Sequence, residues 1–235
     1  MALPLTVAVR VKSFQSTYAP TLTTQQFVVA HRPAISGFPK WKRAFDIVVA
    51  LFLLVFFSPL LFAIAALVAM DGGPIIHRHQ RAGMNARPFD LLKFRVVHHN
   101  AEQRLQELPK RGKSSGKCQK LGDDRRSTRI GTFLYRSGLD ELPQLVNVLM
   151  GSMSIVGPRP IAESETVRYG HYIRHYYQSR PGITGLSQVS GCAEGSYRRR
   201  VAFDTFYARK FGRIGLDLKV IALTLSVVFL GQEAR

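Results

Sequence analysis

The sequence predicts a mainly α-helical fold with a minor β component, built around a kinked, re-entrant membrane helix. Three observations support this prediction. A stretch from Ile47 to Met70 carries no charge and is interrupted by Ser58-Pro59. Apolar residues recur at i, i+3, i+4 and i+7 spacing from about Leu139 to Met150, which is typical of a helix. A second apolar run begins at Leu218. The length of 235 residues suits one domain with appendages.

The first 36 residues mix Pro, Thr, Gln and short apolar runs. They lack a charged segment followed by an apolar segment, the pattern of a secretory signal. We therefore predict that residues 1–36 form a weakly ordered lead-in without a secretory signal.

The uncharged stretch is long enough for a membrane helix, which needs roughly 20 apolar residues. Pro59 removes a backbone hydrogen bond and predicts a kink, and the Ser58 hydroxyl can satisfy part of the freed backbone. Positive charge marks the cytoplasmic side of a membrane, so two basic flanks favour a segment that enters and returns, here residues 37–72. An ordinary kinked transmembrane helix stays open as the alternative. The flanking basic residues are Lys40, Lys42 and Arg43 before the stretch and Arg78, Arg81 and Arg87 after it.

The C-terminal run from Leu218 to Gly231 has about 11 uncharged residues, too few to span a bilayer. We expect a helix packed on the core or lying at the membrane interface.

The formal net charge of +18 predicts an anionic partner: nucleic acid, an acidic membrane surface or phosphorylated small molecules. Two loops narrow this choice. In "MSIVGPRP" (Met153–Pro160) two prolines stiffen the backbone around Arg159, which preorganises its guanidinium for bidentate phosphate contact. "RPGITGLSQVSG" (Arg180–Gly191) repeats the arginine-proline-glycine theme. Two rigid loops of this kind fit polyphosphate better than a long nucleic-acid groove.

An acidic pair, Asp140 and Glu141, stands at the start of the helix predicted from about Leu139 to Met150. Pro143 is acceptable only near a helix start, which places the pair in the first turn. Free N–H groups and the helix dipole stabilise negative charge there. Such a position suits a carboxylate that must stay ionised, but acidic first-turn residues are also common in purely structural helices.

Together these stretches resemble the bacterial sugar transferase family, the small monotopic phosphoglycosyl transferases. The resemblance runs from about Lys42 to Leu230. It rests on motifs in the family's order: the apolar segment broken at Ser58-Pro59, "KFR" at Lys93–Arg95, the D-x-R-x-T-x-x-G spacing from Asp124 to Gly131, "LDELPQLVNVLMGSMSIVGPRP", "RPGITGLSQVSG" and "VAFDTFYARKFGRIGLDLKVI".

The resemblance implies the chemistry. Asp140 is expected to attack the β-phosphate of a UDP-sugar and expel UMP, while Glu141 helps to hold Mg²⁺. Undecaprenyl phosphate then takes the sugar-phosphate from Asp140. "DGG" and "SYRRRVAFDT" look most like the galactosyl-phosphate transferases that start exopolysaccharide synthesis. The expected phosphate- and substrate-binding residues are Lys93, Arg95, Arg126, Arg159, Arg180 and Gln188.

The resemblance also implies a small cytosolic catalytic domain, residues 73–235, with amphipathic interfacial helices. It would work at the cytoplasmic face of the bacterial inner membrane, against anionic lipids, and association into homo-oligomers stays open. Nucleic acid is not expected as a partner.

The chain departs from the family pattern at three places. "KFR" continues with Val96-Val97 instead of Thr-Met, the pair Ser137-Gly138 stands where Thr-Ser is usual, and Cys192 replaces an arginine. These departures leave donor identity open between galactose, glucose and an N-acetylhexosamine. They also leave room for a non-catalytic membrane scaffold or regulator. A glycosyltransferase that releases UDP is disfavoured, because the sequence has no D-x-D and no dinucleotide-type glycine motif.

Overall fold

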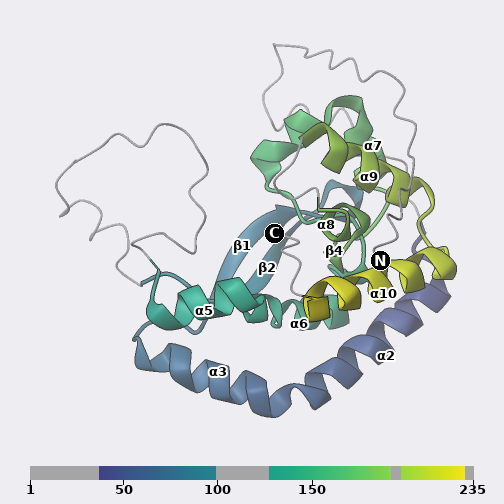
Figure 1. Cartoon of the computed structure of the whole chain (residues 1–235). Helices are drawn as coiled ribbons and strands as arrows, with labels where there is room; N and C mark the ends of the chain where they lie inside the picture. Colours follow the sequence, from purple (N-terminus) through teal and green to yellow (C-terminus); the bar gives the residue numbers. More distant parts are fainter. Residues whose placement is uncertain (1–36, 99–126, 192–196, 231–235) are drawn as a thin grey trace, which may run out of the picture.

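The computed structural model describes residues 37–98, 127–191 and 197–230. These residues are mostly helical, with two separate two-stranded sheets, which confirms the predicted mainly α fold with a minor β component. In Figure 1 two long helices form an arm along one side, and the strands and the other helices lie beside it. The lead-in of residues 1–36 and Arg126 lie outside the described residues. The division between residues 37–72 and residues 73–235 stays a prediction.

The arm consists of α2 (Lys40–Phe56) and α3 (Ser58–Met70), which are bent by 64° where they meet. The bend has a local cause. Pro59 has no N–H to give to the carbonyl four residues earlier, that of Val55. The Ser58 hydroxyl donates to this carbonyl instead, at 2.8 Å. The predicted kink, with serine replacing the lost hydrogen bond, is therefore confirmed.

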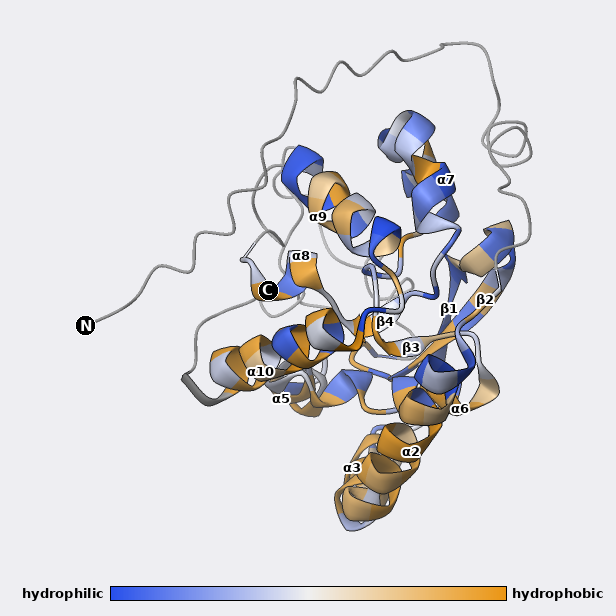
Figure 2. Cartoon of the chain, turned by 90° about the vertical axis from the view of Figure 1, so that its right-hand side faces the viewer, coloured by the Kyte–Doolittle hydropathy of each residue, from blue (hydrophilic) through white to orange (hydrophobic). Residues whose placement is uncertain are grey.

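The arm exposes many large apolar side chains, and Figure 2 shows it as the most continuously hydrophobic part of the ribbon. Within the described ranges no single helix has both the length and the apolar character to cross a bilayer, whereas α2 and α3 taken together do. Re-entrant insertion stays a prediction that this composition supports. The exposed apolar residues of the arm include Val48, Leu51, Phe52, Val55, Phe56, Leu60, Phe62, Leu67 and Met70.

An antiparallel hairpin follows the arm, made of β1 (Ile76–Ala82) and β2 (Pro88–Phe94). Its turn contains the short 3₁₀ helix η1 (Met84–Ala86), with Asn85 in the left-handed region at φ 58°. The Asn147 side chain forms hydrogen bonds with the backbone of β2: it accepts one from the Leu92 N–H and donates one to the Asp90 carbonyl. This places α6 (Gln144–Met150) directly beside the hairpin.

The segment that carries the acidic pair runs α5 (Arg129–Ser137), η3 (Leu139–Glu141), α6. Thr128 begins α5 because its hydroxyl accepts the Gly131 N–H at 2.8 Å. Gly138, at φ 78°, ends α5 in the left-handed conformation that glycine adopts without strain. The prediction of one continuous helix from Leu139 to Met150 is wrong at its start. The acidic pair lies in a separate 3₁₀ turn, and α6 begins only after Pro143.

The two predicted arginine-proline-glycine loops lie side by side. They flank the parallel pair β3 (Ser154–Val156) and β4 (Gly182–Thr184), which are joined through η4 (Glu163–Tyr172) and α7 (Ile173–Tyr176). Gly157 packs so closely on the Arg180 and Gly182 backbone that a Cβ would clash there. After β4 come α8 (Leu186–Val189), α9 (Tyr197–Arg209) and α10 (Ile214–Leu230).

The largest apolar core lies between the arm, α6, β3, α9 and α10, and includes Ala50, Val148, Val156, Tyr207 and Val220. The burial of Val220 shows that the C-terminal run is a helix packed on the core, the first of the two expected positions. Contact of this helix with the membrane interface stays a prediction.

Three charged residues tie the arm to α10, and we call them the helix clamp: Lys42, Asp46 and Asp217. The Lys42 ammonium lies 2.8 Å from Asp217 Oδ2 and 3.8 Å from Asp46 Oδ1, and all three side chains are buried. The Tyr207 hydroxyl lies 2.6 Å from Asp217 Oδ1, as a donor to it. Lys42 was expected as a flanking charge at the membrane surface, but the structure places it inside the protein.

Candidate active site

The acidic pair lies against β2. The Lys93 ammonium is 3.3 Å from Asp140 Oδ2 and 2.9 Å from Glu141 Oε1. The Asp140 side chain is only 2% exposed, whereas Glu141 is 28% and Lys93 22% exposed. One lysine thus holds the two carboxylates together at a point that solvent still reaches. Sequence reasoning expected Lys93 and the pair in one site, and the structure brings them into contact.

A cavity of about 150 Å³ opens beside this contact. From the predicted set it takes in Lys93, Glu141, Arg159 and Gln188. Three buried atoms on its walls have no hydrogen-bond partner within the part of the chain that the structure describes: Arg81 Nε, Arg200 Nε and Gln188 Oε1. Buried polar atoms rarely stay unpaired, so these atoms indicate a polar ligand. The cavity is lined by Arg81, Leu91, Lys93, Glu141, Gln144, Arg159, Pro160, Glu165, Ile183, Gln188 and Arg200.

A buried carboxylate, Asp204 of α9, organises the far wall of the cavity. It accepts hydrogen bonds from the Ser187 and Tyr169 hydroxyls, both at 2.7 Å, and from the Arg159 backbone N–H. Arg200 lies one helical turn before it, with Nε 3.9 Å from Asp204 Oδ2. Burial raises the pKa of Asp204, although its hydrogen-bond donors act in the opposite direction. Asp204 therefore positions two of the three cavity arginines, Arg159 and Arg200, without lining the cavity itself.

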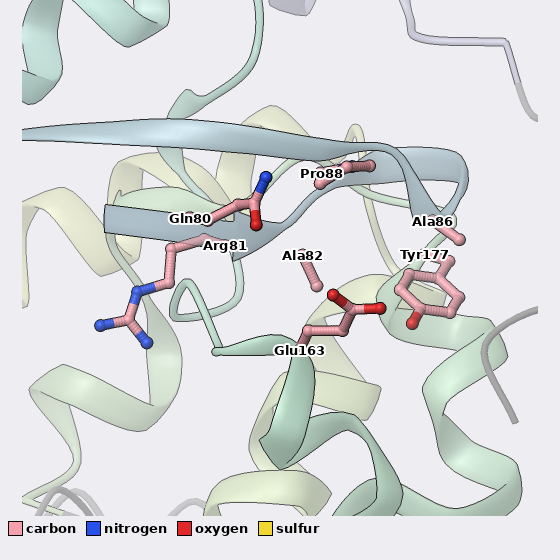
Figure 3. A pocket seen from close by; sticks show the side chains of 7 residues that line it. All are labelled: Gln80, Arg81, Ala82, Ala86, Pro88, Glu163 and Tyr177. Atoms are coloured by element: carbon pink, nitrogen blue, oxygen red, sulfur yellow. The ribbon is translucent and has the colours of Figure 1, made fainter. Parts of the chain in front are cut away.

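Arg81 reaches the cavity from the hairpin. A smaller hollow of about 50 Å³ lies on its other side, below the hairpin turn. Figure 3 shows the Arg81 side chain directed away from Glu163 and Tyr177, which line that hollow. Its guanidinium thus belongs with the larger cavity.

Two of the predicted phosphate-binding arginines are not among the residues that line the cavity. Arg95 is buried and donates from Nη2 to the Val68 carbonyl at 2.8 Å, at the end of α3. Arg180 stacks on the Phe38 ring, with its guanidinium carbon 3.9 Å from the ring centre. Burial, followed by the nearby Arg43, lowers the pKa of Arg180. Arg126 lies outside the described residues.

Sequence reasoning missed four polar residues of the cavity: Arg81, Gln144, Glu165 and Arg200. Arg200 carried a usable signal, since it precedes Asp204 by four residues and so shares its helix face. No sequence signal marked Arg81 or Glu165 as a cavity residue, because the position of Arg81 depends on the hairpin register and that of Glu165 on the path of η4.

The donor set fits Mg²⁺. This ion is usually held by one or two carboxylates, with water and substrate phosphates completing an octahedron. Glu141 is the half-exposed carboxylate at the cavity, and Asp140 is its neighbour. In the described ranges no group of three or more potential protein ligands occurs, so substrate and water would supply the rest.

A sequence model of the bacterial sugar transferase family matches residues 38–231. The chain belongs to the bacterial sugar transferase family. It is 42% identical over 196 residues to exopolysaccharide production protein ExoY of Sinorhizobium fredii, with 81% of this chain and 86% of that protein covered. The family resemblance expected from the motifs is confirmed.

Two further relatives have names that state a reaction. The undecaprenyl-phosphate galactose phosphotransferase of Salmonella typhimurium is 41% identical over 191 residues, covering 80% of this chain and 40% of that protein. The UDP-glucose:undecaprenyl-phosphate glucose-1-phosphate transferase of Caulobacter vibrioides is 38% identical over 193 residues, covering 78% and 68%. This sugar transferase therefore spans less than half of the Salmonella protein.

Proposed function

We propose that this sugar transferase moves a hexose-1-phosphate from a UDP-sugar to undecaprenyl phosphate and releases UMP. The observation that carries the proposal is the acidic pair at the edge of a cavity whose walls hold four cations. These cations are Arg81, Lys93, Arg159 and Arg200. Relatives whose names state undecaprenyl-phosphate sugar transfer support the same reaction.

In the first step a carboxylate oxygen of Asp140 forms a bond to the β-phosphorus of the UDP-sugar. The bond from that phosphorus to the bridging oxygen breaks, and UMP leaves with the electron pair. The diphosphate charge lies against Arg81, Arg159 and Arg200, because phosphoryl transfer depends mostly on positioning and charge neutralisation. Covalent catalysis divides one transfer between two anions into two easier steps.

In the second step an oxygen of the lipid phosphate forms a bond to the same phosphorus, and the bond to Asp140 breaks. The Asp140 carboxylate is regenerated next to the Lys93 ammonium, which is 3.3 Å away in the free protein. Mg²⁺ held by Glu141 would supply further charge neutralisation at the diphosphate.

The exposed surface of the arm supports a membrane location for this chemistry. Its apolar side chains, together with Phe133 of α5 and Leu218 and Val228 of α10, provide exposed hydrophobic surface. We propose that the arm inserts as a re-entrant hairpin into the inner membrane, with the cavity on the cytoplasmic side near anionic lipids. We propose galactose as the donor sugar, on the motifs and on the relative named for galactose. Glucose is the alternative, because the Caulobacter relative is named for glucose.

The test uses purified protein in detergent with undecaprenyl phosphate, Mg²⁺ and a panel of UDP-sugars, and measures UMP and UDP separately. We expect UMP, and we expect Asp140→Asn to lower its release by about 1000-fold or more, as loss of a nucleophile does. Asp90→Asn, an exposed carboxylate on β2, is the matched control and should keep its activity.

Release of UDP would instead indicate a transferase that moves the sugar alone. Release of neither nucleotide by folded protein, with every donor tried, would favour a non-catalytic scaffold or regulator. The donor with the highest rate would identify the sugar.

A further inference from the structure

Two histidines of β1, His77 and His79, lie opposite Lys93 and Leu91 of β2, which line the cavity. Residues directly opposite each other in an antiparallel pair point to the same face of the sheet. Lys93, which lines the cavity, lies opposite His77. His79 is two residues further along β1 and shares this face, since its ring centre is 4.2 Å from that of His77. The two histidines therefore lie on the same face of the hairpin as Lys93 and Arg81.

The side chains on this face of β1 form a row that runs from the Arg159 loop to the arm. The Ala82 end of β1 is bonded to Ile161, next to the Arg159 loop. The Ile76 end follows directly from α3, and the bond from the Arg95 N–H to the Ile75 carbonyl, at 3.0 Å, extends the register toward the arm. His77 and Lys93 are therefore level with each other at the arm end of this face, and Arg81 lies four residues away from His77 toward the Arg159 loop.

Positively charged side chains, Arg81, Lys93 and Arg95, lie near the two histidines. Burial lowers the pKa of His79 to about 4, and His77, Arg81 and Lys93 lower it further in that order. Nearby Arg95 has two buried nitrogens, Nε and Nη1, without a hydrogen-bond partner among the described residues. His77 itself is exposed, so a ligand can reach it.

We propose that the phosphate of the lipid acceptor binds between His77 and Lys93, at the arm end of this hairpin face, while the nucleotide diphosphate binds to Arg81, Arg159 and Arg200. Arg95 does not touch the phosphate and adds positive potential at this end. The inference rests on the proposed two-step function, and it divides the cations of the site between two different anions.

The arrangement suits the second step. A phosphate monoester must approach a phosphorus that already carries negative oxygens, and nearby positive charge reduces this repulsion. A neutral His79 can donate an N–H, and Lys93 contributes a full positive charge. When the new P–O bond forms and the bond to Asp140 breaks, electrons and atoms balance without another reactant.

The test separates the two steps. Exchange of radiolabelled UMP into the UDP-sugar requires only the first step and no lipid. Transfer to undecaprenyl phosphate requires both. We expect His77→Ala to raise the KM for undecaprenyl phosphate by about 10-fold, as loss of one charge-assisted contact does, and to leave exchange within about twofold. Arg200→Gln should show the opposite pattern, with slower exchange.

Arg78→Ala is the matched control, because Arg78 is an exposed neighbour on the opposite face of β1 and should change neither quantity. An unchanged KM in His77→Ala would overturn the inference, as would an equal loss of exchange and transfer.

The positive row could instead bind phospholipid headgroups, so the KM is measured in a neutral detergent. Binding to phosphatidylglycerol vesicles is measured separately, against phosphatidylcholine vesicles. Loss of vesicle binding with an unchanged KM would assign His77 to headgroups and overturn the inference. Absence of UMP exchange in the unmodified protein would overturn the covalent step of the proposed function, while the KM comparison would still decide the acceptor site.

Discussion

Two clusters in this chain each set one lysine between two carboxylates, and they differ in access to solvent. In the helix clamp the lysine is 0% exposed and both carboxylates are at most 1% exposed. In the acidic pair with Lys93, the lysine is 22% and Glu141 28% exposed, beside a cavity. A lysine between two carboxylates therefore stabilises the fold in the helix clamp, where solvent is excluded. In the acidic pair with Lys93, where solvent has access, the same charges can bind a ligand.

The largest effect on stability is expected from breaking the clamp. Lys42→Met leaves Asp46 and Asp217 buried without their cation, which should cost about 3–5 kcal/mol in the free energy of unfolding. Denaturant unfolding in detergent measures this change. Lys219→Met, at an exposed lysine on α10, is the matched control and should change little. A loss below about 1 kcal/mol for Lys42→Met would show that the clamp does not hold the arm.

A second substitution sharpens this result. Replacing Asp217 by Leu in the Lys42→Met background removes one stranded carboxylate, and should recover part of the lost stability because apolar residues often replace buried ion pairs well.

A smaller effect, on turnover, is expected for Lys93→Met. Removal of the ammonium beside the acidic pair should lower turnover by about 100-fold, as loss of one electrostatic contact to a transition state does. The free energy of unfolding should fall by at most about 1–2 kcal/mol, because water can reach the carboxylates from the cavity. Unchanged turnover with a large loss of stability would show that Lys93 and the acidic pair stabilise the fold, as the helix clamp does, and do not act in catalysis.

The smallest of the three effects is expected for Tyr207→Phe. Burial and the nearby Asp217 raise the pKa of Tyr207 well above its usual range, so the hydroxyl keeps its proton. Removing the hydroxyl, which lies 2.6 Å from Asp217 Oδ1 and 2.9 Å from the Val156 carbonyl, should cost about 2 kcal/mol of stability and leave turnover within about twofold. Tyr197→Phe is a useful comparison, since its hydroxyl makes only a 3.3 Å contact and is half-buried. Equal losses in the two variants would show that Asp217 does not depend on this bond.

Four of the predicted site residues line one cavity, and three of them have a local feature that marked them in the sequence. Glu141 follows a helix end, Arg159 sits between prolines, and Gln188 follows a glycine-rich turn. Arg95 and Arg180 had equally suggestive neighbours, but one caps the end of α3 and the other stacks on Phe38. The sequence does not show which of these arginines line the cavity, because each one's partner lies in a distant part of the chain.

The helical character, the kink at Ser58-Pro59, the acidic pair and the family could be predicted from the amino-acid sequence, because each depends on neighbouring residues or on motif order. The burial of Lys42, the contact of Lys93 with the acidic pair, and the shared cavity of Arg81 and Arg200 became clear only in the folded chain. These outcomes depend on strand register and helix packing between residues far apart in the chain. Residue type alone does not specify which charged side chain is buried and which remains accessible to a ligand.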